Sequence, residues 1–252
     1  MAEQQQRLHK LLLPPLPTGF NIIESGHYVY WLNGTAAKVV EPWCKAQNSQ
    51  GQVLVHCARF ADDYGITILV KHHTSPAAKG NNDFSTHISW QQQAQSDICA
   101  QYVYNAEQQQ FSSNLTCDGQ QLINSQQRVD KFLFFPLMRV FSGDIIQELT
   151  LQGPLLTVVP DIQTPQLRTS LLHPTESIRS AKKFGDEQIF IAGKQYDTSR
   201  YAYLSERYQS EDEAVFWLNS QGLLLKYCWQ QSPAQHWQIE LHNYQQFSPI
   251  DR

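Results

Sequence analysis

Apolar and polar residues alternate along most of this chain, which is the pattern of half-buried β-strands rather than of helices. A first alternating stretch starts at Phe20 and reaches Asn33-Gly34, a dipeptide that favours the tight turn of a β-hairpin. The chain then returns as a second strand to Trp43. Further stretches of this kind, separated by short turns, predict strands over 53–60, 66–72, 84–90, 98–104, 110–117, 121–126, 144–151, 155–159, 176–183, 188–191, 196–208, 214–218, 223–230 and 236–247.

One segment breaks the alternation. Residues 131–143, KFLFFPLMRVFSG, are apolar almost throughout, yet the run is too short to cross a bilayer. Inside it stands one charge, Arg139, which is costly to bury unless a carboxylate, a ligand headgroup or water meets it. We expect these residues, here called the plug segment, to form a short helix or a kinked ribbon that plugs a large curved sheet.

These patterns predict an all-β fold. We expect a large antiparallel curved sheet that forms an incomplete β-barrel or clam, of the lipocalin type, with the plug segment near 131–143 as its short helical or kinked element. Residues 1–18 contain three prolines and are expected to form an N-terminal arm laid on the body. Residues 19–252 are expected to form a single domain of two meander halves, about 20–130 and 144–247.

Composition narrows the class of partner. The 252 residues are 41% hydrophobic and 12% aromatic, which is enough for a large core, and the net charge of −4 without a basic run disfavours nucleic acid. No run of about 18 apolar residues occurs, so no membrane span is expected. The N-terminal leucines, cut by prolines, make a poor signal peptide, and the five cysteines contain no CxxC motif. Both features favour a cytoplasmic protein with free thiols.

Two stretches resemble a known family. One contains Trp217-Leu218-Asn219 followed by Gly222-Leu223-Leu224, and the other is FFPLMRVFSGD with Arg139 and Gly143. The first is similar to the closing strands of the LolA/LolB-like superfamily of bacterial lipoprotein carriers, and both are similar to DUF3108-type β-clam proteins. The resemblance implies an apolar cavity, with a helix or loop as its stopper, that holds acyl chains or other hydrophobic ligands. Those relatives are exported, whereas this chain shows no export signal, and Asn219 stands where they commonly have an acidic residue.

Signatures of metal or cofactor chemistry are absent, so neither a metal nor a cofactor is expected. The adjacent histidines His72 and His73 would point to opposite faces of a regular strand and would not bind one ion. The sequence contains no GxSxG, HExxH or glycine-rich phosphate loop. The carboxylates that occur, such as Asp62 and Asp63, are expected to cap turns or to lie in solvated loops.

Arg139 and the aromatic residues are the candidates for binding. Arg139 either anchors a carboxylate or phosphate headgroup at the mouth of a cavity or forms a salt bridge with Asp144 or Glu148 that fixes the plug segment. Aromatic residues recur in pairs at i and i+2, so each pair faces one side of a strand and either fills a core or lines a cavity. Their large number favours a cavity. The candidate ligand-binding residues are Arg139, Phe135, Met138, Tyr30, Trp90, Tyr102, Tyr201, Tyr203, Trp217 and Trp229.

The sequence therefore favours a protein that binds an apolar small molecule or a lipid in an internal cavity. One alternative is an enzyme on a lipocalin-like scaffold, such as an isomerase, cyclase or hydratase of a polyketide, terpenoid or pigment precursor, because such enzymes need only a shaped pocket and one or two acid or base groups. Another alternative is an interaction module that binds no ligand and forms a homodimer through an exposed edge strand.

Overall fold

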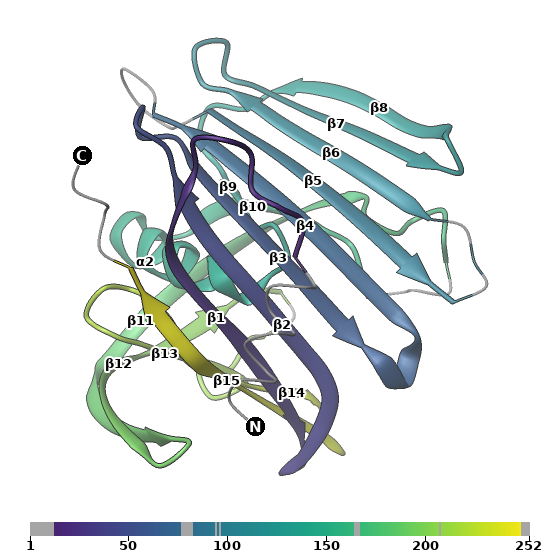
Figure 1. Ribbon diagram of the computed structural model, residues 1–252. Helices are drawn as coiled ribbons and strands as arrows, with labels where there is room; N and C mark the ends of the chain where they lie inside the picture. Colours follow the sequence, from purple (N-terminus) through teal and green to yellow (C-terminus); the bar gives the residue numbers. More distant parts are fainter. Residues whose placement is uncertain are drawn as a thin grey trace.

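The computed structural model describes residues 13–76, 83–93, 95, 97–163, 167–206 and 208–247. Strands dominate this part of the chain, and a single α-helix of the described residues lies between the two halves (Figure 1). The elements in chain order are β1 (Asn21–Leu32), β2 (Thr35–Gln47), β3 (Val53–Ala61), η1 (Asp62–Tyr64), β4 (Ile66–Ser75), β5 (Asp83–Gln92), β6 (Ile98–Asn105), β7 (Gln110–Cys117), β8 (Gln120–Arg128), β9 (Leu133–Phe134), η2 (Arg139–Phe141), α2 (Ser142–Gln152), β10 (Leu155–Pro160), β11 (Pro174–Ile191), β12 (Lys194–Leu204), β13 (Ala214–Leu218), β14 (Leu224–Ser232) and β15 (Gln235–Gln246).

The strands form one 15-stranded sheet in the order β8-β7-β6-β5-β4-β3-β2-β1-β15-β14-β13-β12-β11-β10-β9. Hydrogen-bonded neighbours run antiparallel except β9 and β10, which are parallel. The two edges of the sheet, β8 and β9, follow each other in the chain and only residues 129–132 separate them. Because so short a connection spans little distance, the sheet must curl until its edges approach each other. The predicted all-β fold with a large curved and unclosed sheet is confirmed.

The alternation of side chains defines an inner face, the face that contacts the plug segment. On β5, Thr86, Ile88 and Trp90 are buried, whereas His87 between them is exposed. Phe84 lies on the same side as the buried residues and stacks on Phe134 of the plug segment, with ring centroids 5.1 Å apart. The strand pattern read from the sequence thus corresponds to the two faces of a real sheet.

The plug segment is a kinked ribbon that ends in a helical turn. Its residues Leu133 and Phe134 form β9, and the Phe135 amide donates to the Val158 carbonyl of β10 at 2.9 Å. The turn η2 (Arg139–Phe141) follows and leads directly into α2. The short helix expected near 131–143 therefore begins at the end of the plug segment, at Ser142.

The predicted strand over 144–151 is wrong, because these residues belong to α2. Ile145, Ile146 and Leu149 recur at helical spacing and are buried, while α2 packs against β11. Gly153, with a φ of 80°, ends the helix. The run is so short that its apolar residues suit a strand as well as a helix, and burial of one helix face decided the outcome.

Two glycines from the segments that resemble β-clam proteins meet in space. A Cβ atom on Gly143 would lie 1.8 Å from the carbonyl oxygen of Gly222, which follows β13. A Cβ atom on Gly222 would lie 2.4 Å from Oε1 of Gln147 in α2. The first turn of α2 can therefore approach the β13–β14 turn only because Gly143 lacks a side chain, whereas the Gln147 side chain could move away from a Cβ on Gly222.

The outer face of β3 and β4 is covered by the part of the N-terminal arm that is described. The Pro14 carbonyl lies 3.2 Å from Nδ1 of His56, and the Phe20 ring contacts the His73 ring edge-on at 6.1 Å. These contacts bury the polar side chain of His56 on this face. The predicted arm over 1–18 lies within the described residues only from position 13 onwards.

Candidate functional site

Aromatic rings fill the inner face of the first half, where they surround the plug segment. Phe134 contacts Phe84, Tyr102 and Phe111 at centroid distances of 5.1, 5.0 and 5.8 Å. Phe132 meets Tyr104 and Phe111 edge-on at 5.0 and 5.4 Å. We call this set, with Phe84, Tyr102, Tyr104, Phe111, Phe132 and Phe134, the aromatic cluster. The plug segment here occupies the space that a ligand would occupy in an open barrel.

The inner face of the second half carries a different arrangement, here called the aromatic ladder. Tyr203, Phe216, Tyr227, Trp229 and Trp237 come from β12, β13, β14 and β15. Successive ring centroids lie 5.7, 4.0, 4.8 and 5.5 Å apart, and the last three pairs are stacked with interplanar angles of 24°, 9° and 9°. Stacked rings cover one another's faces, and Tyr203, Phe216 and Tyr227 are buried, so Trp229 and Trp237, which are half-buried, are the more accessible rings of the ladder.

Arg139 of the plug segment lies on this ladder. Its guanidinium carbon is 4.8 Å from the Tyr227 ring centroid and 5.5 Å from that of Trp229, a cation–π geometry. The buried Nε atom of Arg139 has no hydrogen-bond partner. Within the described residues no carboxylate oxygen lies within 4.0 Å of the guanidinium, so the salt bridge to Asp144 or Glu148 considered above is not formed.

A second guanidinium, that of Arg179 on β11, lies at the start of the ladder. Its carbon is 5.5 Å from the Tyr203 ring centroid, and it donates hydrogen bonds to the Tyr203 hydroxyl and, at 2.8 Å, to Ser177 Oγ. Burial raises the pKa of Tyr203, and the positive charges of Arg179 and Arg139 partly offset this effect. Both arginines therefore act electrostatically on one phenol. Sequence reasoning missed Arg179. Ala181, two residues later, faces the same side of β11 and pairs with Tyr203 of β12, and this pairing brings Arg179 close to the Tyr203 ring.

A buried ion pair holds the plug segment in place. Glu41, fully buried on β2, accepts hydrogen bonds from Arg59 Nε and Nη2 at 2.9 and 2.8 Å and from the Tyr30 hydroxyl at 2.7 Å. Its second oxygen accepts the backbone N–H of Arg139, and Arg59 donates to the Leu137 carbonyl at 3.0 Å. This network also fixes Leu137 in a left-handed conformation, with a φ of 67°, that a leucine rarely adopts.

The sequence did contain a signal for this ion pair. Glu41 and Arg59 each lie in phase with inner-face residues, Glu41 two positions before Trp43 and Arg59 two positions after Cys57. A charged residue at such a position predicts a buried partner of opposite charge. Neither residue was among the candidates, because the pairing of β2 with β3 was needed to bring them together.

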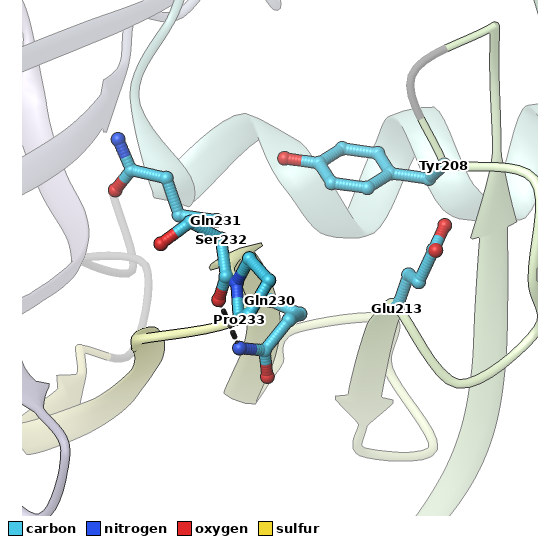
Figure 2. A pocket seen from close by; sticks show the side chains of 6 residues that line it. All are labelled: Tyr208, Glu213, Gln230, Gln231, Ser232 and Pro233. Carbon is cyan, nitrogen blue, oxygen red and sulfur yellow. Dashed lines mark hydrogen bonds between the residues drawn. The ribbon is translucent and has the colours of Figure 1, made fainter.

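A hollow borders the second half, and Figure 2 shows the side chains that line it. It has a volume of about 560 Å³ and is lined by Tyr208, Glu213 and the residues 230–233 that follow Trp229. The Tyr208 ring lies 6.4 Å from the Tyr203 ring, and its side chain is hydrogen-bonded to Tyr227. Tyr208 therefore lines the hollow and contacts two rings of the ladder.

A second hollow of about 420 Å³ lies between α2 and Tyr201 of β12. Its lining is mostly polar and includes Asp144 and Glu148. Withdrawal from water raises the pKa of the Asp144 carboxyl, an effect that the positive charge of Lys45 partly offsets. No arginine lines this hollow, so it suits an anion less well than the ladder does.

The candidate residues fall into separate groups. The structure brings together Arg139, Tyr203 and Trp229 at the ladder, with Tyr201 on the same inner face. Trp217 points to the outer face, opposite to its neighbour Phe216, and its indole N–H donates to Glu187 at 2.6 Å. The others lie elsewhere on the inner side: Tyr30 at the ion pair, Trp90 and Tyr102 on the inner face of the first half, Phe135 and Met138 in the plug segment.

The histidine pair behaves as a regular strand requires. His72 faces inwards, where its ring meets Phe141 edge-on at 5.0 Å and its Nδ1 lies 2.7 Å from Thr86 Oγ1. His73 faces outwards against Phe20. In the described part of the chain no three His, Cys, Asp or Glu side chains gather as metal ligands would. The same residues include no helix long and apolar enough to span a membrane.

Comparison with known proteins adds information on the fold. No family model and no curated protein matches this sequence. A solved structure of a beta-barrel-like protein of the domain of unknown function DUF1849 from Brucella abortus is similar, with a TM-score of 0.50 and 9% sequence identity. The similarity covers 90% of this chain and 98% of that one. At this identity the likeness shows the fold alone, and that fold is barrel-like.

Proposed function

We propose that this protein binds a hydrophobic small molecule or a lipid on the aromatic ladder, with Arg139 at the polar end of the ligand. The observation that carries the proposal is the position of Arg139. A guanidinium lies on an apolar surface of stacked rings, its Nε is buried without an acceptor, and no carboxylate within the described residues neutralises it. A bound amphipathic molecule would cover the rings and satisfy the charge at the same time.

The contrast between the two halves supports the ladder, rather than the aromatic cluster, as the ligand site. In the first half the rings of Phe132 and Phe134 already occupy the inner face, and the Tyr102 hydroxyl has an acceptor in the Leu172 carbonyl. In the second half Tyr208, whose ring lies 6.4 Å from that of Tyr203, lines a hollow of about 560 Å³, a volume within the range of small-molecule sites. The internal cavity expected from the sequence is therefore proposed at this narrower location.

The family resemblance and the cytoplasmic location remain part of the proposal. A barrel-like sheet with a stopper segment is what the resemblance to LolA/LolB-like and DUF3108-type proteins implies, and a lipid ligand would agree with it. The five cysteines are free, which suits a reducing compartment. A homodimer through the edge strand β8 is a further proposal, tested by light scattering of the purified protein.

A pair of tryptophan variants tests the proposed site. Binding of Nile red, an uncharged apolar dye, is titrated by fluorescence, and native mass spectrometry of gently purified protein shows whether a ligand is retained. Trp229→Ala removes a ring of the ladder and is expected to weaken dye binding by about tenfold. Trp217→Ala removes a ring of the outer face and is expected to leave dye binding unchanged. Equal effects of the two variants, or no dye binding by the wild type, would contradict the proposal.

A further inference from the structure

Two arginine side chains on the inner face of the second half lack a carboxylate partner. Arg139 lies on Tyr227 and Trp229, and Arg179 lies on Tyr203 and donates only to the uncharged oxygens of Tyr203 and Ser177. Within the described residues no carboxylate oxygen lies within 4.0 Å of either guanidinium. Two partly buried positive charges thus lie along one row of rings, Arg179 at Tyr203 and Arg139 at Tyr227 and Trp229, with Phe216 between Tyr203 and Tyr227.

Two other arginines of the described residues have carboxylate partners. Arg59 is paired with the buried Glu41 at 2.8 Å, and Arg200 on the outer face lies 3.9 Å from Glu187 and 3.3 Å from Asp212. Glu41 also accepts the backbone N–H of Arg139, but its charge is already balanced by Arg59. The positive charge at Arg139 and Arg179 is therefore a local excess that an anion would neutralise.

We propose that Arg139 and Arg179 bind the anionic headgroup, a carboxylate or a phosphate monoester, of an amphipathic ligand. This inference rests on the proposed function, because it assigns the polar end of the same ligand. Guanidinium groups held on aromatic rings are pre-oriented to donate paired hydrogen bonds to the oxygens of such a headgroup. Arg179 also lies next to the Tyr203 hydroxyl, which is a further donor.

The rest of the ligand follows from the ladder itself. Its rings come from four adjacent strands, β12 to β15, and so extend over three inter-strand spacings, roughly 14 Å. An apolar chain of medium length would cover Trp229 and Trp237 while its headgroup meets the arginines. A ligand of this class is a fatty acid or an alkyl phosphate, rather than a neutral apolar compound or a free anion.

The test compares probes that differ in charge or in the presence of an alkyl chain. Displacement of Nile red is measured with decanoate, with decanol and with inorganic phosphate. For the wild type we expect decanoate to displace the dye at a concentration at least tenfold lower than decanol, because only decanoate brings a negative charge to the guanidinium groups. Inorganic phosphate is expected to leave the dye bound, because it lacks an apolar chain.

Arginine variants then assign the preference to these residues. Arg179→Gln and Arg139→Gln are each expected to reduce the preference for decanoate over decanol by about tenfold. Arg200→Gln, which removes a guanidinium from the outer face, is the matched control and should preserve the preference. If Arg139→Gln does not fold, Arg179→Gln alone decides, since among the described residues the Arg179 side chain makes hydrogen bonds only to Ser177 and Tyr203.

The outcomes separate this inference from the proposed function. Equal displacement by decanoate and decanol, or a preference that survives Arg179→Gln, would overturn the headgroup assignment while leaving apolar binding intact. Displacement by inorganic phosphate at concentrations as low as those of decanoate would show a site for free anions and would also overturn it. Failure of the wild type to bind Nile red at all would refute the proposed function itself.

Discussion

The aromatic cluster and the aromatic ladder use the same kinds of residue and differ in what the rings meet. In the cluster, Phe132 and Phe134 of the plug segment pack among rings of β5, β6 and β7. Phe134 is stacked on Phe84, the other ring pairs are edge-on or tilted, and the centroids lie 5.0–6.4 Å apart. In the ladder, the rings stack on one another, and the groups placed over them are the guanidinium groups of Arg139 and Arg179.

This difference distinguishes a core from a candidate site. Rings that interlock with apolar neighbours gain dispersion and lose water contact, so their contribution is to stability. Rings that lie under charged groups without counter-ions gain less, and the charges that accompany them are costly to the folded state. A costly arrangement of this kind is typical of functional sites.

The largest effect is expected from truncation within the cluster. Phe134→Ala should lower the free energy of unfolding by about 3–5 kcal/mol, because it removes a ring that contacts three others. Trp237→Ala, the matched change at the end of the ladder, should cost less than half of that, since Trp237 is only half-buried. Urea unfolding followed by circular dichroism measures both. Equal losses would remove the distinction between the two regions.

The buried ion pair links the two regions through the plug segment. Glu41→Gln should lower the free energy of unfolding by about 3 kcal/mol, because it leaves Arg59 buried without its counter-charge. Asp63→Asn, which breaks the exposed pair between Lys38 and Asp63, should change it by less than about 0.5 kcal/mol. A small effect of Glu41→Gln in the same urea experiment would show that the plug segment is held by apolar contacts alone.

A pH titration should affect the cluster through His72. Burial, and to a lesser extent the charge of His73, lowers the pKa of His72 to about 4, against 6.5 in an unfolded chain. The unfolded chain therefore binds a proton below pH 6.5 while the folded protein does not, so stability falls as the pH falls from about 6.5 to about 4. His72 should account for about 3 kcal/mol of this loss.

The control for this titration is His72→Gln, which has no group that titrates in this range at that position. Its stability should change less than that of the wild type between pH 7 and pH 5, where few carboxylates titrate. Unfolding midpoints in urea at each pH provide the comparison. Parallel pH profiles for the two proteins would contradict the predicted role of His72.

The smallest effect on stability is expected at the ladder arginines. Arg179→Gln should change the free energy of unfolding by less than about 1 kcal/mol, because Arg179 has no carboxylate partner to leave unpaired. A thermal melt measures this change. A large loss would mean that Arg179 serves the fold, and the contrast between cluster and ladder would then be weaker.

Sequence reasoning was most successful where the chain signals its conformation locally. The Asn33-Gly34 turn, with φ values of 51° and 77°, joins β1 and β2 as expected, and His72 and His73 point to opposite faces. It failed at α2, because its eleven residues fit both the 3.6-residue period of a helix and the two-residue period of a strand. Sequence reasoning also placed Trp217 among the candidate ligand-binding residues. Every residue of β13 is apolar, so alternation does not reveal which of them face inwards.

The sequence by itself determined the all-β character of the protein, the break at the plug segment and the pairing of ring faces along each strand, because these depend on neighbours one or two residues apart. Only the tertiary structure decided that Glu41 meets Arg59 and the plug segment, and that Arg139 and Arg179 converge on the ladder. These contacts join residues far apart in the chain, and the curvature and order of fifteen strands set which of them meet.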